Sequence, residues 1–592
     1  MNRRKVRGVA NERTPGVTAG MSFRRALDFS PPLLIAALWA FLYLPHIPAA
    51  GLVRDELGFL PVWQGSERFI GWIDEPRSFE TYFEYQAWVS SMSHIQWRPV
   101  SGVLHGLCYW FFGATPWPYH LINLSLFLAS VLFIYVALAN VLPRSTAILT
   151  AAFALVYATA GATVFSSVMM NSNLAALTWS GALYLDSRAS PPSRSRNLAV
   201  VVLLLLSSLS YEVFIPLFLA NAMLRVWRDH WPPWPGLGRL LGSTWPVLLA
   251  LVLFVAYRVA IAPLVFAGGQ PAIEPSLTLA TLRYLESIVL GLQEYFVKGF
   301  TVSLSSLPNV GALPGVALAS IIALLACLAI LVRASSAHLA RQSTARTPGA
   351  VGETGWRRPA PPWLGQLAVV AVLFLAAHMI FAVSDYIPRS TGFETRTQGA
   401  MRFVVALLLG LIATGIYAAV RGRVTRQLIS VLTFGLAAFL ALSNVGQREA
   451  WIAAARYNDV LLVKMEGAIR SAGLLEQSRF TFIADLPERF PGQVNGEPIF
   501  GETWDIGPAL SLAFPTSTIR ANVYDVPGTI VLADMAIFHG YWEAPYPFYF
   551  YRFNDNQIYT VASSADLSRL IDMGEAGAGL APGAAEVFGS SL

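Results

Sequence analysis

The sequence contains few charged residues and only two cysteines. Asp, Glu, Lys and Arg make up 13% of the 592 residues, and 55% are hydrophobic. Soluble domains usually carry roughly a quarter charged residues, so this composition excludes an ordinary soluble protein. Cys108 and Cys327 both lie in apolar stretches, which excludes a disulfide framework and a Cys-x-x-Cys metal site. The composition instead predicts a polytopic α-helical membrane protein.

The sequence contains many long apolar runs. A membrane helix needs about 20 apolar residues, and we predict about eleven such spans. They fall near residues 31–50, 118–141, 146–162, 168–185, 198–210, 213–226, 244–266, 311–333, 364–384, 401–420 and 427–444. The predicted transmembrane domain therefore covers residues 31–445 and follows a cytoplasmic tail, residues 1–30.

The distribution of arginine predicts the orientation. A net charge of +6 would suit a nucleic-acid partner, but the arginines gather in short turns between spans. The positive-inside rule explains this pattern better, so we expect no nucleic acid. All of these turns lie inside if the short run 98–113 is a juxtamembrane helix within the first outer loop, 51–117. We therefore predict a bacterial cytoplasmic (inner) membrane protein with a cytoplasmic N-terminus.

The composition changes after the last predicted span. Apolar residues at helical spacing predict an amphipathic helix over about 447–475. Short strand-like runs follow at 480–484, 529–533 and 547–551, separated by Pro and Gly. Residues 446–580 are therefore predicted to form a small extracytoplasmic α/β domain, with a disordered Gly- and Ala-rich tail at 581–592.

With this topology, charged residues gather at the outer rim of the membrane. A charge costs about 2.5–3.5 kcal/mol at the centre of a membrane helix, so persistent charges need a reason. The rim residues of interest are Asp55, Glu56, Arg98, Glu212, Arg389 and Arg396, with Arg258 inside its span but toward the outer end.

Each of these residues also has a simpler interpretation. Asp55 and Glu56 could form a solvated turn, and Arg98 could anchor a surface helix to lipid headgroups. Arg258 could extend its side chain along the span to the interface. The remaining arginines, Arg389 and Arg396, could pair with Asp385 and Glu394 as loop charges.

Several short motifs occur in a characteristic order. An acidic pair follows the first span, Arg98-Pro99 opens a short helix that ends at Phe112-Gly113, and Leu-Ser-Tyr-Glu occupies 209–212. Together with Pro-Tyr-His-Leu-Ile-Asn-Leu at 118–124, this pattern resembles the GT-C superfamily of polytopic glycosyltransferases. It is most similar to the protein O-mannosyltransferase and lipid A aminoarabinose transferase branches, over about residues 30–226.

The resemblance implies a GT-C-like fold and a function. Such an enzyme would move a sugar from a polyprenyl-phosphate donor to a hydroxyl of a glycan, lipid or protein outside the cytoplasmic membrane. Asp55 would act as general base with Glu56 as its partner, and Glu212 would be a further catalytic residue. Arg98, Arg258, Arg389 and Arg396 would bind the donor phosphate, because guanidinium groups match phosphate in bidentate fashion.

A divalent cation such as Mg²⁺ or Mn²⁺ is a further possible component of the site. The acidic pair could help to bind it, but the sequence has no Asp-x-Asp motif at this position. The outer turn at 164–173 also lacks charged residues. Both departures from the family pattern weaken the prediction of a metal.

Two other classes of function stay open. A transporter or lipid flippase usually shows internal repeats and charges at the membrane midplane, whereas here no clear repeat is found and the charges gather at one rim. A non-catalytic scaffold for envelope assembly would need little beyond the C-terminal domain. The sugar, the acceptor and the stereochemical outcome are not predicted.

Overall fold

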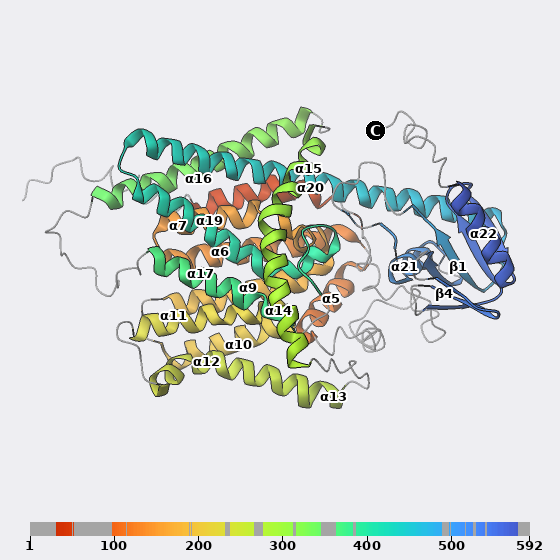
Figure 1. Cartoon of the computed structure of the whole chain (residues 1–592), viewed down its shortest axis with the longest axis horizontal. Helices are drawn as coiled ribbons and strands as arrows, with labels where there is room; N and C mark the ends of the chain where they lie inside the picture. Colours follow the sequence, from red (N-terminus) through yellow and green to blue (C-terminus); the bar gives the residue numbers. More distant parts are fainter. Residues whose placement is uncertain are drawn as a thin grey trace, which may run out of the picture.

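The computed structural model consists of a helix bundle with a small α/β domain at one end (Figure 1). The described residues are 31–49, 51, 98–113, 115–188, 190, 192–230, 237–265, 276–311, 315–344, 363–382, 386–487, 496–497, 499–501, 503–514, 517–524, 529–538 and 542–577. We call the end of the bundle next to the α/β domain the domain end, and the opposite end the far end.

The bundle contains helices at all eleven predicted spans. The first part of the chain forms the apolar helix Pro31–His46, α5 (Pro99–Phe112), α6 (Pro116–Val141), α7 (Arg144–Val156), α9 (Met170–Ser187), α10 (Arg194–Ser210), α11 (Phe218–His230), α12 (Leu237–Ala256) and α13 (Ala262–Val265). The second part forms α14 (Leu277–Leu292), α15 (Gly299–Gly311), α16 (Gly315–Thr344), α17 (Trp363–Ala377), α18 (Met379–Ala382), α19 (Gly399–Ala419) and α20 (Arg423–Ser471).

Six helical segments of the described chain are long and apolar enough to cross a membrane: Pro116–Val141, Leu237–Ile261, Leu318–Ala340, Trp363–Ala382, Thr395–Ala419 and Arg423–Ser471. Two shorter apolar helices, Pro31–His46 and Arg144–Val156, lie beside them. This supports a multi-pass membrane protein, while the predicted number of eleven crossings stays a prediction.

Short irregular segments interrupt the bundle at the domain end. They are η4 (Ala158–Ala160), α8 (Ala162–Phe165), η5 (Ser167–Met169), η6 (Glu212–Leu217) and η9 (Phe393–Gln398), with π-helical turns at η7 (Tyr257–Ile261) and η8 (Gln293–Lys298). The predicted span 146–162 is therefore too long, since α7 ends at Val156. The predicted span 213–226 begins as a 3-10 segment and becomes α-helical only from Phe218. This segment contains Pro216, and proline inside a helix removes a backbone hydrogen bond.

The helix α5 has the character predicted for the run 98–113. It is not one of the six candidate spans, and it runs obliquely to the long helices at the domain end (Figure 1). Its exposed apolar side chains, Val103, Leu107, Trp110 and Phe111, recur at helical spacing, whereas His105 and Cys108 are buried. One apolar face is thus left for lipid, as in an interfacial helix.

The helix α20 corrects one prediction. The sequence suggests a break between a last span at 427–444 and a separate helix at 447–475, but α20 is a single helix of 49 residues. At 1.5 Å per residue it is about 73 Å long and connects the bundle to the α/β domain. Gly446 does not break it; a Cβ there would lie 2.0 Å from the backbone oxygen of Ser306 in α15, so glycine allows the close approach of the two helices.

The α/β domain is built on a four-stranded sheet of order β2-β1-β6-β7. The strands are β1 (Arg479–Asp485), β2 (Thr518–Val523), β6 (Phe548–Arg552) and β7 (Gln557–Val561), and β1 pairs in parallel with β2 and β6. A three-stranded antiparallel sheet of order β3-β4-β5 combines β3 (Ile530–Val531), β4 (Met535–Phe538) and β5 (Trp542–Pro545), and the helices are α21 (Thr503–Ala513) and α22 (Ser564–Gly577). The three predicted strand runs correspond to β1, β3 and β6.

The alternation of side chains along β1 explains the layers of this domain. Phe480, Phe482 and Ala484 share one hydrophobic core with the end of α20 and with α21. Ile483 points to the other face and shares a second core with β4, β6 and α22, including Leu567. Successive side chains of a strand point to opposite faces, so the sheet is covered on both sides.

Candidate active site

The segment between α10 and α11 places a carboxylate at the domain end. The helix α10 ends at Ser210, and Tyr211 is extended, with φ −160° and ψ 117°. Glu212 then begins the 3-10 segment η6, in which Pro216 prevents a regular α-helix. This local sequence ends α10 at the domain end, where Tyr211 stays buried in the core and Glu212 is partly exposed.

Glu212 forms a bidentate ion pair with Arg98, the N-cap residue of α5. Arg98 Nε donates to Oε2 of Glu212 at 3.0 Å, and Nη2 donates to Oε1 at 2.6 Å. The guanidinium also lies over the Tyr211 ring, 4.4 Å from its centroid. Both paired side chains are 21% exposed, so the pair is packed but still accessible.

Electrostatics fix the ionisation of this group. Burial acts to raise the pKa of Glu212, but the charge of Arg98 and its hydrogen bonds, with a further contribution from Arg258, lower that pKa to about 2. Burial raises the pKa of the Tyr211 hydroxyl to about 12. Near neutral pH, Glu212 is therefore an anion and Tyr211 is neutral. A carboxylate with so low a pKa is a weak base and is better suited to holding Arg98 in place.

Two further predicted arginines belong to the same cluster. Arg258 lies in the π-turn η7, and its charge reaches both Glu212 and Arg98. Arg396, in η9, donates from Nη2 to the hydroxyl of Tyr386 at 3.3 Å and lies over that ring. Arg396 and Tyr386 both act electrostatically on Tyr211.

Four of the predicted site residues thus meet in space, although they lie far apart in the sequence. We call Arg98, Glu212, Arg258 and Arg396 the rim cluster. Their formal charges sum to +2, which would favour an anionic ligand.

A buried glutamate holds the turn that carries Arg396. Glu294 in η8 is 5% exposed and accepts hydrogen bonds from the backbone N–H of Ser390 at 2.8 Å and from its hydroxyl at 2.7 Å. Lys298, one turn later, pairs with the same carboxylate. The sequence reasoning missed Glu294; the signal was a carboxylate followed by lysine four residues later within an otherwise apolar segment.

The same turn touches the α/β domain. Gly392 has φ +67°, and a Cβ there would lie 3.0 Å from the carbonyl oxygen of Gly496. The hydroxyl of Thr395 also accepts a hydrogen bond from the backbone N–H of Ala162 at 2.9 Å. The turn is therefore held between the bundle and the α/β domain. Arg389, within it, is exposed, and its role in binding phosphate stays a prediction.

Asp55 and Glu56 lie outside the described residues, in the segment between Gly51 and Arg98. The carbonyl oxygen of Gly51 lies 3.2 Å from Nε2 of His120 in α6. The ring of His46 is 5.0 Å from that of His120, centroid to centroid. His46 and His120 are 74 residues apart in the sequence, which is not the spacing of a ligand motif. Only the packing of the first helix on α6 brings their rings together.

The described residues offer few ligands for a metal ion. In the described part of the chain, no group of three or more His, Cys, Asp or Glu side chains is arranged to hold a metal ion. The predicted acidic pair is not among those residues. A Mg²⁺ or Mn²⁺ ion bound by Asp55 and Glu56 therefore stays a prediction.

An apolar groove runs through the bundle from Leu217 toward the far end, where Val141, Trp227 and Gln366 line it. Its walls come from α6, α9, α11, α17 and α19, and include Trp179, Leu183, Phe403 and Leu407. The groove reaches Leu217, the last residue of the 3-10 segment that begins at Glu212. An apolar channel thus ends close to a cationic cluster.

Comparisons with known proteins gave three distant structural matches. No protein-family model and no curated protein matches the chain. The chain is similar to an oligosaccharyltransferase from Archaeoglobus fulgidus tethered with an acceptor peptide, at 13% identity over 85% of this chain and 64% of that one, with a TM-score of 0.33. It is also similar to ArnT from Cupriavidus metallidurans bound to undecaprenyl phosphate, at 14% identity over 85% of this chain and 90% of that one, with a TM-score of 0.32.

The apo form of the same ArnT is 14% identical over 87% of this chain and 97% of that one, with a TM-score of 0.31. The chain spans less than two thirds of the length of the oligosaccharyltransferase. Both proteins are glycosyltransferases of the GT-C superfamily, which the sequence motifs also resemble. At TM-scores of this size, no residue role or substrate passes from them to this chain.

Proposed function

We propose that this protein is an integral-membrane glycosyltransferase. It takes a sugar from a polyprenyl-phosphate donor and transfers it to a hydroxyl acceptor at the domain end, on the outer face of the cytoplasmic membrane. The observation that carries the proposal is the rim cluster of three arginines and one carboxylate, which includes Glu212 at the start of the 3-10 segment whose last residue, Leu217, lines an apolar groove.

The rim cluster suits the leaving phosphate of such a donor. When the bond between sugar and phosphate breaks, negative charge develops on the phosphate oxygens, and fixed cations that meet this charge stabilise the transition state. Arg98, Arg258 and Arg396 supply that charge, and Arg389 in the same turn is a fourth candidate. Glu212 acts as a positioning residue, because its two hydrogen bonds fix the plane of the Arg98 guanidinium.

The acceptor hydroxyl must lose a proton during transfer. We assign this step to Asp55, with Glu56 beside it in the sequence. Adjacent carboxylates raise one another's pKa, which brings a base closer to neutrality. Glu212 is less suited to this role, since its pKa of about 2 makes it a poor proton acceptor.

The groove suits the lipid part of the donor. Its lining is almost entirely apolar, and each buried methylene contributes roughly 0.8 kcal/mol to binding. A polyprenyl chain in the groove would place its phosphate near Leu217 and hence near the rim cluster.

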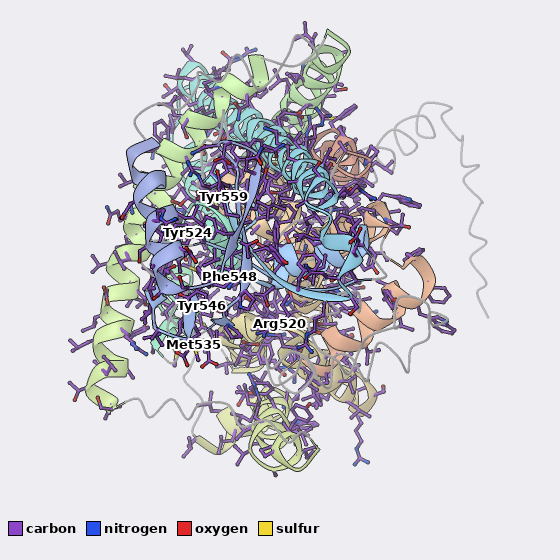
Figure 2. All side chains as sticks on the ribbon, turned by 90° about the vertical axis from the view of Figure 1, so that its right-hand side faces the viewer. Arg520, Tyr524, Met535, Tyr546, Phe548 and Tyr559 are labelled. Atoms are coloured by element: carbon purple, nitrogen blue, oxygen red, sulfur yellow. The ribbon has the colours of Figure 1, made fainter. Side chains whose placement is uncertain are left out.

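The α/β domain is suited to contribute to the acceptor site. Figure 2 views the molecule from the domain end and labels Tyr524, Tyr546 and Phe548 beside α22. The rings of Tyr546 and Phe548 are stacked, 5.4 Å apart. Tyr524 and Tyr546 are half-buried, and aromatic rings are common at binding surfaces.

The test uses the full-length protein in vesicles with a panel of radiolabelled undecaprenyl-phosphate sugars and an envelope extract as the acceptor. We expect Asp55→Asn to lower transfer by a factor on the order of 100 or more, because a general base contributes 10²–10⁴-fold. Glu56→Gln should have a smaller effect. Arg188→Gln, at an exposed far-end arginine, is the matched control and should not change transfer.

Unchanged transfer by Asp55→Asn would remove this residue from the mechanism. A larger loss in Glu56→Gln than in Asp55→Asn would reverse their roles. Movement of intact lipid-linked sugar across the vesicle membrane, with no cleavage of the sugar–phosphate bond, would instead support the transporter class.

A further inference from the structure

A second cationic site lies at the far end of the bundle, remote from the rim cluster. A cavity of about 890 Å³ opens between α16, the end of α19 and the start of α20. Four arginines line it, Arg333 from α16 and Arg421, Arg423 and Arg426 from the turn and helix that follow α19. We propose that this cavity binds the headgroup of an anionic phospholipid.

The charge of the cavity is not balanced by its own walls. The sequences of α16, α19 and the stretch 420–440 contain no Asp or Glu. A membrane offers anionic headgroups at this depth, and basic pockets between transmembrane helices are known sites for them.

The positions of the side chains match the two parts of a phospholipid. A hydrogen bond of 2.8 Å between the hydroxyls of Ser336 and Ser430 fixes the register of α16 against α20. On the far-end side of this bond lie Arg423 and Arg426, at the mouth of the cavity. On the other side lie Arg333, one turn before Ser336 in α16, and apolar residues, including Val431 and Phe434. A headgroup phosphate at the mouth would thus leave its acyl chains along an apolar wall.

The backbone adds to the attraction for a phosphate. The helix α20 begins at Arg423 after Gly422, and no side chain caps its first turn. The N–H groups of a first helical turn carry partial positive charge and favour anions. Arg426 is half-buried: its Nε donates to the carbonyl of Val420 at 2.9 Å, and its guanidinium lies over the Tyr417 ring. Arg426 is therefore held at the mouth, whereas Arg421 and Arg423 are exposed.

The site is separate from the proposed transfer reaction. Both α16 and the first part of α20 are candidate membrane spans, and the two helices lie side by side in the bundle (Figure 1). Arg421, Arg423 and Arg426 lie at the far end of these helices and Arg333 lies within the candidate span of α16, whereas the rim cluster lies at the domain end.

The test measures phosphatidylglycerol binding to the delipidated full-length protein in a non-ionic detergent, by native mass spectrometry. We expect wild type to bind phosphatidylglycerol but not phosphatidylcholine. The double variant Arg421→Gln/Arg423→Gln should bind about 30-fold more weakly, from roughly fivefold for each arginine near an anionic surface. The charge-matched control, Arg188→Gln/Arg239→Gln, removes two exposed far-end arginines outside the cavity and should bind like wild type.

The variant Arg421→Lys/Arg423→Lys keeps the charge and should retain most of the binding, which separates loss of charge from damage to the fold. Equal weakening by the cavity and control variants would overturn the proposal, because binding would then follow net charge alone. Displacement of phosphatidylglycerol by equimolar inorganic phosphate would also overturn it, since the site would then bind free phosphate rather than a lipid.

Discussion

Two of the ion pairs between arginine and a carboxylate in the described part of the bundle lie at opposite ends. At the domain end, Arg98 and Glu212 approach to 2.6 Å, and both side chains are 21% exposed. At the far end, Arg225 of α11 and Asp186 of α9 approach to 2.5 Å and are 2% and 0% exposed. The chemistry of the two pairs is the same, but their surroundings differ.

The difference indicates which pair serves a ligand. Asp186 and Arg225 lie in regular helices, and Asp186 accepts a further hydrogen bond from Asn221 at 2.9 Å. No ligand can reach them without opening the helix packing. Arg98 and Glu212 lie at the starts of α5 and η6, outside regular helix. The far-end pair therefore joins two helices, whereas the domain-end pair holds a guanidinium at an accessible surface.

The largest expected effect comes from breaking the far-end pair. Asp186→Ala should lower stability by about 3–5 kcal/mol, because it leaves the charge of Arg225 buried without its partner. The measurement is thermal unfolding of the purified protein in detergent. The double variant Asp186→Leu/Arg225→Met should recover most of the loss. If Asp186→Ala were as stable as wild type, the two pairs would not differ as described.

The second prediction concerns Arg98. Arg98→Gln should lower the rate of transfer from a polyprenyl-phosphate donor about 100-fold, the size found when one donor to a developing oxyanion is removed. Its stability should fall by less than that of Asp186→Ala, because the Arg98–Glu212 pair is partly exposed whereas Asp186 and Arg225 are buried. Parallel transfer and unfolding measurements on Arg98→Gln and Asp186→Ala should thus give opposite patterns. A large stability loss with normal transfer in Arg98→Gln would make this pair structural.

The third prediction separates two titrating groups beside α5. Burial lowers the pKa of His105 from 6.5 to about 4. Below pH 6.5 the unfolded chain protonates this histidine while the folded protein keeps it neutral. The contribution of His105 to the free energy of unfolding is therefore fully present above pH 6.5 and is lost as the pH falls toward 4. At pH 5 the loss is about 2 kcal/mol. Glu212 has a lowered acid pKa, so its contribution is complete above about pH 4.5 and declines only toward pH 2.

Unfolding of wild type should therefore become easier between pH 6.5 and 5, and His105→Asn should weaken this dependence. Glu212→Gln should leave it unchanged. The opposite assignment of the two variants would contradict these pKa directions.

The smallest expected effect is on the turn that carries Arg396. Ser390→Ala removes the 2.7 Å hydrogen bond from the hydroxyl to Glu294 but leaves the backbone hydrogen bond in place. The cost should be about 1 kcal/mol. Donor affinity, measured as the KM for the polyprenyl-phosphate sugar, should weaken two- to fivefold. Ser305→Ala, at a hydroxyl that donates to the carbonyl of Val302 within α15 at 3.0 Å, provides a comparison of the same chemical change.

Much of the architecture could be predicted from the sequence, because hydropathy and periodicity are properties of contiguous residues. Every predicted span overlaps a helix, the short run 98–113 forms α5, and three strand runs of the C-terminal domain occur as expected. The strands β2, β4, β5 and β7 were missed, since their sequences are short and lack strong alternation. The continuity of α20 was missed because the composition changes near residue 445 from an apolar to an amphipathic pattern, although the helix itself continues.

The sequence alone determined that the protein belongs in a membrane and that its charged residues avoid the middle of the spans. It also singled out Arg98, Glu212, Arg258 and Arg396 one by one. Only the tertiary structure decided that Arg98 holds Glu212 across 114 residues of sequence, and that Glu294 fixes the turn beside them. Such pairings depend on how helices pack, which local patterns do not encode.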